Sequence, residues 1–437
     1  MDESLEKSAM RKIYWRLLPF AILCYVLAYI DRINSSFAAL TMRGDLNMSA
    51  AEYGFAVGTF YWAYFLFEVP SNIILEKVGA RVWIARIMIT WGIFATATAF
   101  VTGTTSFGIV RFLLGMGEAG FFPGLILYFT YWFPARHHAR IVSGFLVGLP
   151  VAVALGAPVS GWLLSLHGLF GLKGWQIMYI AEGLPTIVLG VVFYLVMTNR
   201  PAEATFLTQQ EKDWLSAKLA GERKAKEAVR VYSMLESMFN VKVLLLALNY
   251  LGIVTASLGM LFFIPQIIKS LGTNTSDMTA ILLTMIPYIC GGISLVVWGR
   301  ISDKMNERRW NLLVACILST GGLVMAGLTM GTWWALVGMS LAAMGFYGSK
   351  GPFFAMPPMF LSGTALAAGF AWINSIGNLG GFFGPWWIGV MKDLTGSFAG
   401  GLYGLALLSL ISAVVCALFL HIPDPHAAPD AKLAAAK

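Results

Sequence analysis

The sequence predicts an all-α membrane protein of twelve transmembrane helices, and three observations lead to this prediction. The 437 residues are 58% hydrophobic and only 12% charged, about half the charged fraction of ordinary soluble domains. Apolar runs recur along the whole chain, each near the roughly 20 residues that cross a bilayer. Basic residues gather in alternate connecting segments. A soluble core could not hide this much apolar surface.

Twelve apolar runs can be delimited, and the first of them follows sixteen mostly polar residues. This run is full length and has no small-residue cleavage site after it, so it is expected to be a retained helix rather than a signal peptide. The expected spans are 17–39, 52–75, 82–101, 106–131, 139–165, 175–197, 241–269, 277–299, 310–330, 332–354, 363–391 and 398–421.

The distribution of Lys and Arg predicts the orientation of these helices, because basic residues favour the cytoplasmic side. With the N-terminus inside, the inner segments hold 23 basic residues. The outer segments hold only Arg43, Lys173, Lys269 and Lys392. The chain is therefore expected to cross a plasma (inner) membrane with both termini in the cytoplasm. The net charge of +8 follows from this topology and does not indicate nucleic-acid binding.

A polar stretch at 198–240 separates six expected helices from six. The predicted organisation is an N-terminal six-helix bundle at 1–197, a cytoplasmic central loop at 198–240, and a C-terminal six-helix bundle with a short cytoplasmic tail at 241–437. The loop is expected to form a solvated amphipathic segment at the membrane surface.

The two halves carry similar loops after their second helices. Residues 71–81 read SNIILEKVGAR, and residues 299–304 read GRISDK, followed by two further arginines. These loops resemble the signature loop of the major facilitator superfamily, in which acidic and basic residues latch helix ends together. Asn72 and Glu76 depart from the usual Gly and Asp of that pattern. The resemblance implies a major facilitator fold and the gating residues Glu76, Lys77, Arg81, Asp303, Lys304 and Arg308.

Seven ionisable residues form the informative set inside the expected spans, because an ionisable group there costs at least ~2.5–3.5 kcal/mol and needs a partner, a cavity or a function. Asp31 and Arg32 either face a polar interior or snorkel at the outer end of their helix. Arg111 and Glu118 lie two turns apart on one helix face, as an ion pair or as site residues. The other three are Glu68, Glu182 and Lys350.

Glu68 and Glu182 lie beside prolines and are interpreted as hydrogen-bond acceptors between helices. Lys350 lies among glycines and a proline, which predict a broken helix that exposes its backbone to a site. Two interpretations stay open for it. Lys350 is either a second cation for a second carboxylate of the substrate, or a lysine that snorkels to the cytoplasmic end of its helix.

Three motifs resemble the anion:cation symporter family of this superfamily. They read Tyr-x-Asp-Arg-x-Asn at 29–34, Arg-Phe-x-x-Gly-x-x-Glu-Ala-Gly-Phe-x-Pro at 111–123, and INSIGNLGG at 373–381. Members of the family carry tartrate, phthalate, sugar acids, hydroxyphenylacetate and other organic anions. The resemblance covers nearly the whole chain and implies a proton-coupled symporter that imports a small organic carboxylate by alternating access. Dicarboxylates and aromatic acids are both among the substrates that it implies.

The family's proton-coupling acids correspond to Asp31 and Glu118, and its anion-binding arginines to Arg32 and Arg111. The substrate-binding set that follows is Arg32, Tyr29, Tyr64, Arg111, Lys350, Asn374 and Asn378. Arginine stays charged and can hold a carboxylate with two hydrogen bonds, and a carboxylic acid in a low-dielectric cavity can exchange protons near neutral pH. If Arg111 pairs with Glu118, an anion that competes for the arginine would couple the two events.

Other classes of function are disfavoured by the sequence. No GxxxxGK[ST] phosphate loop is present, which argues against ATP-driven pumping. The four cysteines fall in apolar runs without metal-ligand spacing, so no cofactor or metal is expected. The expected partners are the organic anion, protons and the lipid bilayer, and the chain is expected to be a monomer. The alternatives are a facilitator or proton symporter for a neutral sugar-like solute, and a membrane-embedded enzyme.

Overall fold

The computed structural model describes residues 2–146, 148–227, 238–272, 275–305, 307–361 and 363–420. Within these ranges all regular secondary structure is helical, as the sequence predicts. Eight of the described helical segments are long and apolar enough to cross a membrane. Part of the expected central loop, and the tail with Lys432 and Lys437, lie outside the described residues.

The helix bounds follow the expected spans closely. The first half contains α1 (Asp2–Asp45), α2 (Ala50–Val78), α3 (Ala80–Ala97), α4 (Thr104–Glu118), α5 (Phe121–Thr130), α6 (Ala135–Leu146), α7 (Gly148–Ser165) and α8 (Gly174–Val196), with 3₁₀ turns η1 (Thr98–Phe100) and η2 (Leu169–Gly171). Between the halves lie η3 (Pro201–Glu203) and α9 (Gln209–Glu227). The second half contains α11 (Val241–Lys269), α12 (Asp277–Met305), α13 (Arg309–Leu328), α14 (Trp334–Gly348), α15 (Lys350–Ala355), η4 (Pro357–Met359), α16 (Gly363–Asn378), α17 (Gly380–Thr395) and α18 (Ala399–Leu418).

Two of the expected spans are interrupted near residues that the sequence marks as unusual. The span that contains α4 and α5 breaks at Gly120, whose φ of +90° is a left-handed conformation that favours glycine. The expected break beside Lys350 is confirmed, because α14 ends at Gly348 and α15 begins at Lys350. Both breaks place charged side chains, Glu118 and Lys350, at helix ends inside the protein.

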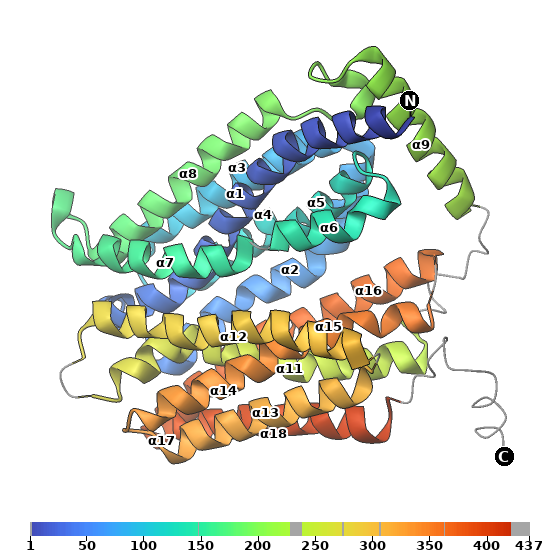
Figure 1. The fold of residues 1–437 in the computed structure, drawn as a ribbon. Helices are drawn as coiled ribbons and strands as arrows, with labels where there is room; N and C mark the ends of the chain where they lie inside the picture. The colour runs from blue at the N-terminus through green and yellow to red at the C-terminus, as the bar shows by residue number, and fades with distance from the viewer. Residues whose placement is uncertain are drawn as a thin grey trace, which may run out of the picture.

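The helices form two bundles, as predicted (Figure 1). In the first bundle α1 packs on α7 and α8, α2 on α4, and α3 on α8. In the second, α13 packs on α14 and α18, α12 on α14, and α11 on α16, α17 and α18. The bundles meet mainly where α2 packs on α17, α7 on α12, and α1 on α11. We call the end of the molecule where α1 begins and α9 lies the α9 face, and the end where α1 terminates the opposite face (Figure 1).

Polar contacts join the two bundles at the opposite face. The backbone N–H groups of Ala50 and Ala51, at the start of α2, donate to the two carboxylate oxygens of Asp393 on α17 over 3.0 and 2.7 Å. A carboxylate at this position satisfies free helix N–H groups and complements the helix dipole. Arg43 of α1 donates to the side-chain oxygen of Gln266 on α11. These contacts hold the opposite face closed.

Glycines allow α2 and α17 to approach each other closely over this interface. A Cβ on Gly54 would overlap the backbone of Pro385, and one on Gly58 would overlap Phe382. On the other helix, a Cβ on Gly389 would overlap the backbone of Ala50. Because backbone atoms cannot move aside as flexible side chains can, this packing tolerates no larger residue at these positions without separating the helices.

The helix α9 is anchored to the first turns of α1, beside which it lies in Figure 1. Lys12 donates to both carboxylate oxygens of Glu211 at 2.9 Å, and the Ser8 hydroxyl donates at 2.7 Å. Burial alone would raise the pKa of Glu211, but hydrogen bonds from Lys12, the Thr208 backbone and Ser8 outweigh it and lower the pKa to about 2. The stabilisation is complete above the ordinary value of 4.5 and is lost as the pH falls through about 2.

The close approach of α2 and α17 leads to a prediction about Gly54→Ala. Alanine favours the helix, yet its Cβ would overlap Pro385, and such overpacking costs about 1–3 kcal/mol. We expect the variant to shift the population towards a state that is open at the opposite face. Distances between spin labels at positions 47 and 270, measured in a cysteine-free background, should lengthen and broaden.

The matched control is Gly44→Ala, because a Cβ on Gly44 has no other atom within 4 Å. Label distances in the control should equal those of the unsubstituted protein. Unchanged distances in Gly54→Ala would show that the α2–α17 contact does not hold the opposite face closed.

Candidate functional site

The polar segment of α1 lies inside the first bundle and not at the end of its helix. Asp31 is only 2% exposed. One of its carboxylate oxygens accepts hydrogen bonds from the Trp91 indole of α3 at 3.0 Å and from the Thr186 hydroxyl of α8 at 3.2 Å. Its other oxygen has no hydrogen-bond partner among the described residues. The alternative in which Asp31 snorkels to the outer helix end is therefore wrong.

Further polar contacts continue along the interface between α1 and α8. Asn34 donates to Glu182 at 2.9 Å, and Ser160 of α7 donates to the same carboxylate at 2.6 Å. The Tyr179 hydroxyl donates to the Ser35 hydroxyl at 3.0 Å. Glu182 thus accepts hydrogen bonds from two other helices, which confirms the interpretation of this residue. These contacts fix the rotation of α1 about its own axis.

That rotation directs Arg32 away from the bundle core and towards α4. Arg32 forms an ion pair with Glu118, the last residue of α4. The Arg32 side chain is 27% exposed, whereas that of Glu118 is 3% exposed. The guanidinium also lies 5.4 Å from the ring centre of Phe60 and 5.7 Å from that of Tyr64, both on α2. Two residues proposed for different roles, one for the anion and one for the proton, are therefore in direct contact.

Arg111 does not pair with Glu118, a possibility that the sequence had left open. Although it shares a helix with Glu118, that carboxylate pairs with Arg32 instead. Arg111 is fully buried, and none of its three guanidinium nitrogens has a hydrogen-bond partner among the described residues. Its guanidinium lies 5.2 Å from the ring centre of Phe60. The quadrupole of this ring stabilises a cation but cannot replace a counter-ion, so an electropositive region surrounds Phe60.

The second bundle contributes Tyr347 and Lys350 to this region. The hydroxyl groups of Tyr29 on α1 and Tyr347 on α14 are 3.4 Å apart. The Lys350 ammonium, at the start of α15, lies 4.6 Å from the ring centre of Tyr347. A chain of contacts therefore connects Lys350, through Tyr347 and Tyr29, to the helix of Arg32. Within the described part of the chain, the Lys350 ammonium makes no ion pair.

A polar contact between α2 and α16 lies further towards the α9 face. Glu68 accepts hydrogen bonds from the side chains of Asn374 at 3.2 Å and Ser375 at 3.3 Å. Glu68 is therefore a hydrogen-bond acceptor between helices, as interpreted, but its partners belong to the other bundle. Apart from the polar INSIGN motif, no feature of the sequence indicates that partnership. Asn378 lies one turn after Asn374, is partly buried, and has no described hydrogen bond.

Three of the six expected gating residues make side-chain contacts, all within their own bundles. Arg308 forms an ion pair with Asp303 at 2.7 Å. Arg81 donates to the Tyr194 carbonyl at 2.6 Å and lies over the ring of the same residue. Across the described ranges, Glu76, Lys77 and Lys304 have no side-chain hydrogen bond or ion pair. The two signature loops are thus not latched to each other in this conformation.

The contacts between bundles are unequal at the two ends of the molecule. At the opposite face, ion-dipole contacts and glycine packing join the bundles. Towards the α9 face, Glu68 and its two partners make the described polar contacts between bundles. Figure 1 shows the helices of the two bundles diverging towards α9. The residues around Phe60 therefore lie between a closed end and a more weakly joined end.

Comparison with known proteins agrees with this architecture. Residues 21–385 match the family model described as Major Facilitator Superfamily. A protein of Agrobacterium vitis named "Putative tartrate transporter" is 47% identical over 427 residues, which cover 98% of this chain and 94% of that protein. The "Inner membrane transport protein RhmT" of Escherichia coli K12 is 38% identical and covers 95% of this chain and 96% of its own length.

Solved structures show the same fold at low sequence identity. A bacterial homologue of the human lysosomal transporter Spinster has a TM-score of 0.73 at 16% identity, over 92% of this chain and 96% of its own. A D-xylose-proton symporter also has a TM-score of 0.73 at 16% identity, over 94% of this chain and 98% of its own.

The resemblance to anion:cation symporters drawn from the three motifs is consistent with these relatives. The family match covers most of the chain, and the relatives that align over nearly their whole length are named as transporters. The alternative of a membrane-embedded enzyme is therefore excluded. The chain is a multi-pass membrane transporter that belongs to the Major Facilitator Superfamily.

Proposed function

We propose that this transporter is a proton-coupled symporter that imports a small organic carboxylate by alternating access. The observation that carries the proposal is the contact between Arg32 and Glu118, beside the buried Arg111 that has no described counter-ion. A site for a neutral solute would have no reason to bear the cost of two intramembrane arginines. A relative named for tartrate supports an organic acid as the substrate.

In this proposal the anion binds at Arg32, whose guanidinium is partly exposed. A carboxylate can accept two parallel hydrogen bonds from a guanidinium, and Glu118 already occupies one such position. The incoming anion therefore competes with Glu118 for the same donors. Tyr64, whose ring lies beside the Arg32 guanidinium, is a further substrate-binding residue in this proposal, as are Tyr29 and Asn378. The buried Arg111, which also lies beside the ring of Phe60, adds a positive potential.

Proton coupling follows from that competition. When the substrate takes over Arg32, Glu118 loses its counter-ion in a buried position, and an isolated buried carboxylate is far more stable when protonated. Anion binding therefore favours protonation of Glu118, and release of the anion favours its loss. Asp31 serves as the second proton-coupling acid in this proposal, because one of its buried carboxylate oxygens has no hydrogen-bond partner within the described part of the chain.

The conformational cycle and the orientation are part of the same proposal. The excess of basic residues supports an inner-membrane protein with both termini, and hence the α9 face, in the cytoplasm. We retain the division into 1–197, 198–240 and 241–437, and a monomer as the transporting unit. The contact between Glu68 and Asn374 is already made in this conformation. Contacts between the two signature loops would be added to it and close the cytoplasmic end when the opposite face opens.

The proposal predicts a specific loss in Glu118→Gln. Glutamine keeps the shape of the side chain but cannot take up the proton, so acceleration of uptake by an inward pH gradient should disappear. Exchange of labelled for unlabelled anion, which needs no net proton movement, should continue. Both can be measured with tartrate in proteoliposomes of the purified variant.

Glu182→Gln is the matched control, because Glu182 is an equally buried acid of the same bundle that is hydrogen-bonded without an ion pair. It should keep its response to the gradient. Full gradient-driven uptake by Glu118→Gln would contradict the coupling role of Glu118. A wild-type protein that transports without any response to pH would instead support the facilitator alternative.

The two interpretations of Lys350 differ in how many carboxylates the site accepts. If Lys350 is a second cation for the substrate, Lys350→Ala should lower the affinity for dicarboxylates by roughly tenfold or more, since a hydrogen bond to a charged group contributes about 1.5–3 kcal/mol. Monocarboxylates should bind unchanged. Thermal-shift titrations with paired mono- and dicarboxylic acids of the same chain length would measure this difference.

Lys350→Arg keeps the positive charge and serves as the control, which should retain the preference for dicarboxylates. Equal responses of Lys350→Ala and the unsubstituted protein to every acid would place Lys350 outside the substrate site.

A further inference from the structure

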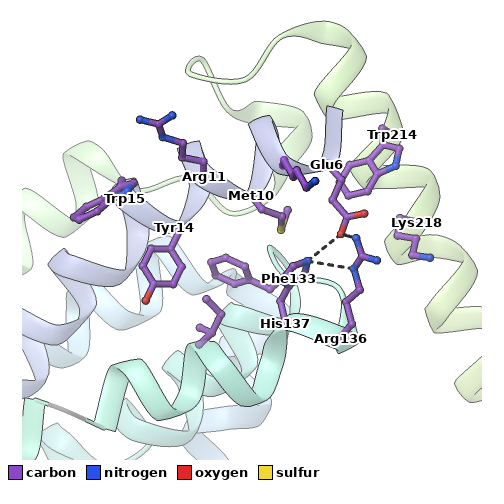
Figure 2. Close-up of a pocket in the computed structure, with 12 residues that line it drawn as sticks. Glu6, Met10, Arg11, Tyr14, Trp15, Phe133, Arg136, His137, Trp214 and Lys218 are labelled. Atoms are coloured by element: carbon purple, nitrogen blue, oxygen red, sulfur yellow. Dashed lines mark hydrogen bonds and ion pairs between the residues drawn. The ribbon is translucent and has the colours of Figure 1, made fainter. Parts of the chain in front are cut away.

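A cavity of about 700 Å³ lies at the α9 face, and none of the proposed substrate-binding residues lines it (Figure 2). It is bounded by the first turns of α1, by the segment that leads from α5 into α6, and by α9. Four Lys or Arg side chains and one carboxylate line it, together with several aromatic residues. This composition suits an anion that also offers apolar surface.

The single carboxylate of the cavity is already neutralised. Glu6 of α1 forms an ion pair with Arg136 and contacts the His137 ring at 2.9 Å (Figure 2). These contacts tie α1 to the start of α6. The side chains of Arg11 and Lys218 also line the cavity, and within the described residues neither makes a hydrogen bond or an ion pair. The cavity therefore keeps a surplus of positive charge.

The wall formed by α9 is held in place by Glu211. Lys12 and Ser8 bind this carboxylate, and Trp214 and Lys218 follow it by one and two helical turns. Because Glu211 fixes the start of α9 on α1, Lys218 faces the cavity from the side across from Arg11. The two unpaired cations thus come from separate helices that a charged contact holds together.

The depth of the cavity matches the headgroup layer of a membrane. The candidate span of α1 covers 42 residues, or about 63 Å at 1.5 Å per residue, whereas the hydrocarbon core is only about 30 Å thick. The first turns of α1 must therefore project beyond the hydrocarbon. Trp15, which is 70% exposed beside the cavity, is a residue that favours the membrane interface.

We propose that this cavity binds anionic phospholipids, whose headgroups meet Arg11 at one end of the cavity and Lys218 at the other (Figure 2), with Trp15 packed against an upper acyl chain. Basic pockets between helices at a membrane surface recognise such headgroups. A soluble phosphate compound offers the same anion, but it would leave Trp15 exposed, so the lipid fits the whole cavity better. This site requires only the membrane-spanning fold and does not depend on the identity of the transported substrate.

The experiment compares two double variants of the full-length protein. Arg11→Ala with Lys218→Ala removes the two unpaired cations of the cavity. Arg16→Ala with Lys212→Ala removes the same charges from the same two helices, outside the residues that line the cavity. Each protein is incubated with phosphatidylglycerol, with phosphatidylcholine of the same acyl chains, or with glycerol 3-phosphate. Retained lipid is counted by native mass spectrometry, and thermal stability is recorded.

The unsubstituted protein and the control variant should retain phosphatidylglycerol at least fivefold more than phosphatidylcholine, and phosphatidylglycerol should raise their melting temperatures. The cavity variant should lose this preference while melting as a folded protein without added lipid. Equal retention of the two lipids by the unsubstituted protein, or an undiminished preference in the cavity variant, would overturn the proposal. It would also be overturned if glycerol 3-phosphate stabilised the protein through these residues as well as the lipid does, because the ligand would then be soluble.

Discussion

The contact between Arg32 and Glu118 is the interaction on which the organisation of the site depends. It joins α1 to the end of α4 and leaves Arg111 without a described counter-ion. A buried ion pair contributes little net stability when it is intact, but the loss of one partner leaves an isolated buried charge that strongly destabilises the protein. Such a pair is suited to exchange partners rather than to strengthen the fold. A carboxylate substrate and a proton together can satisfy both side chains.

The surroundings of this pair are rigid on one side and adaptable on the other. Inside the first bundle, Asp31, Asn34 and Ser35 fix α1 against α3 and α8 through short hydrogen bonds. Between the bundles, the glycine packing of α2 on α17 closes the opposite face. Towards the α9 face, the described polar contact between bundles is Glu68 with two side chains of α16. A transporter that rocks its bundles needs this combination of fixed cores and exchangeable ends.

The sequence was sufficient to predict the helical architecture, because the hydropathy of a segment depends only on its own residues. Each of the twelve expected spans corresponds to one helix or to two helices in line, and the break beside Lys350 followed from its glycines and proline. The break at Gly120 was not expected, although glycine also marks it, because a single glycine inside an apolar run is usually tolerated by a helix.

The pairing inside the site could not be predicted in the same way. Helical spacing places Arg111 and Glu118 on one face of their helix. The rotation of α1, which is set by its contacts to α3 and α8, directs Arg32 towards Glu118, so Glu118 pairs with Arg32. The partners of Glu68 are about 300 residues away in sequence, and periodicity within one helix carries no information on such contacts. The cavity at the α9 face likewise joins three separate segments.

The central claim is that the substrate replaces Glu118 at Arg32 and thereby favours the uptake of a proton from the medium by Glu118. Calorimetric titration of the purified transporter with the anion, in two buffers of different ionisation enthalpy at the same pH, measures the protons exchanged on binding. The account predicts proton uptake on anion binding that is lost in Glu118→Gln. A binding enthalpy that is independent of the buffer in the unsubstituted protein would contradict it.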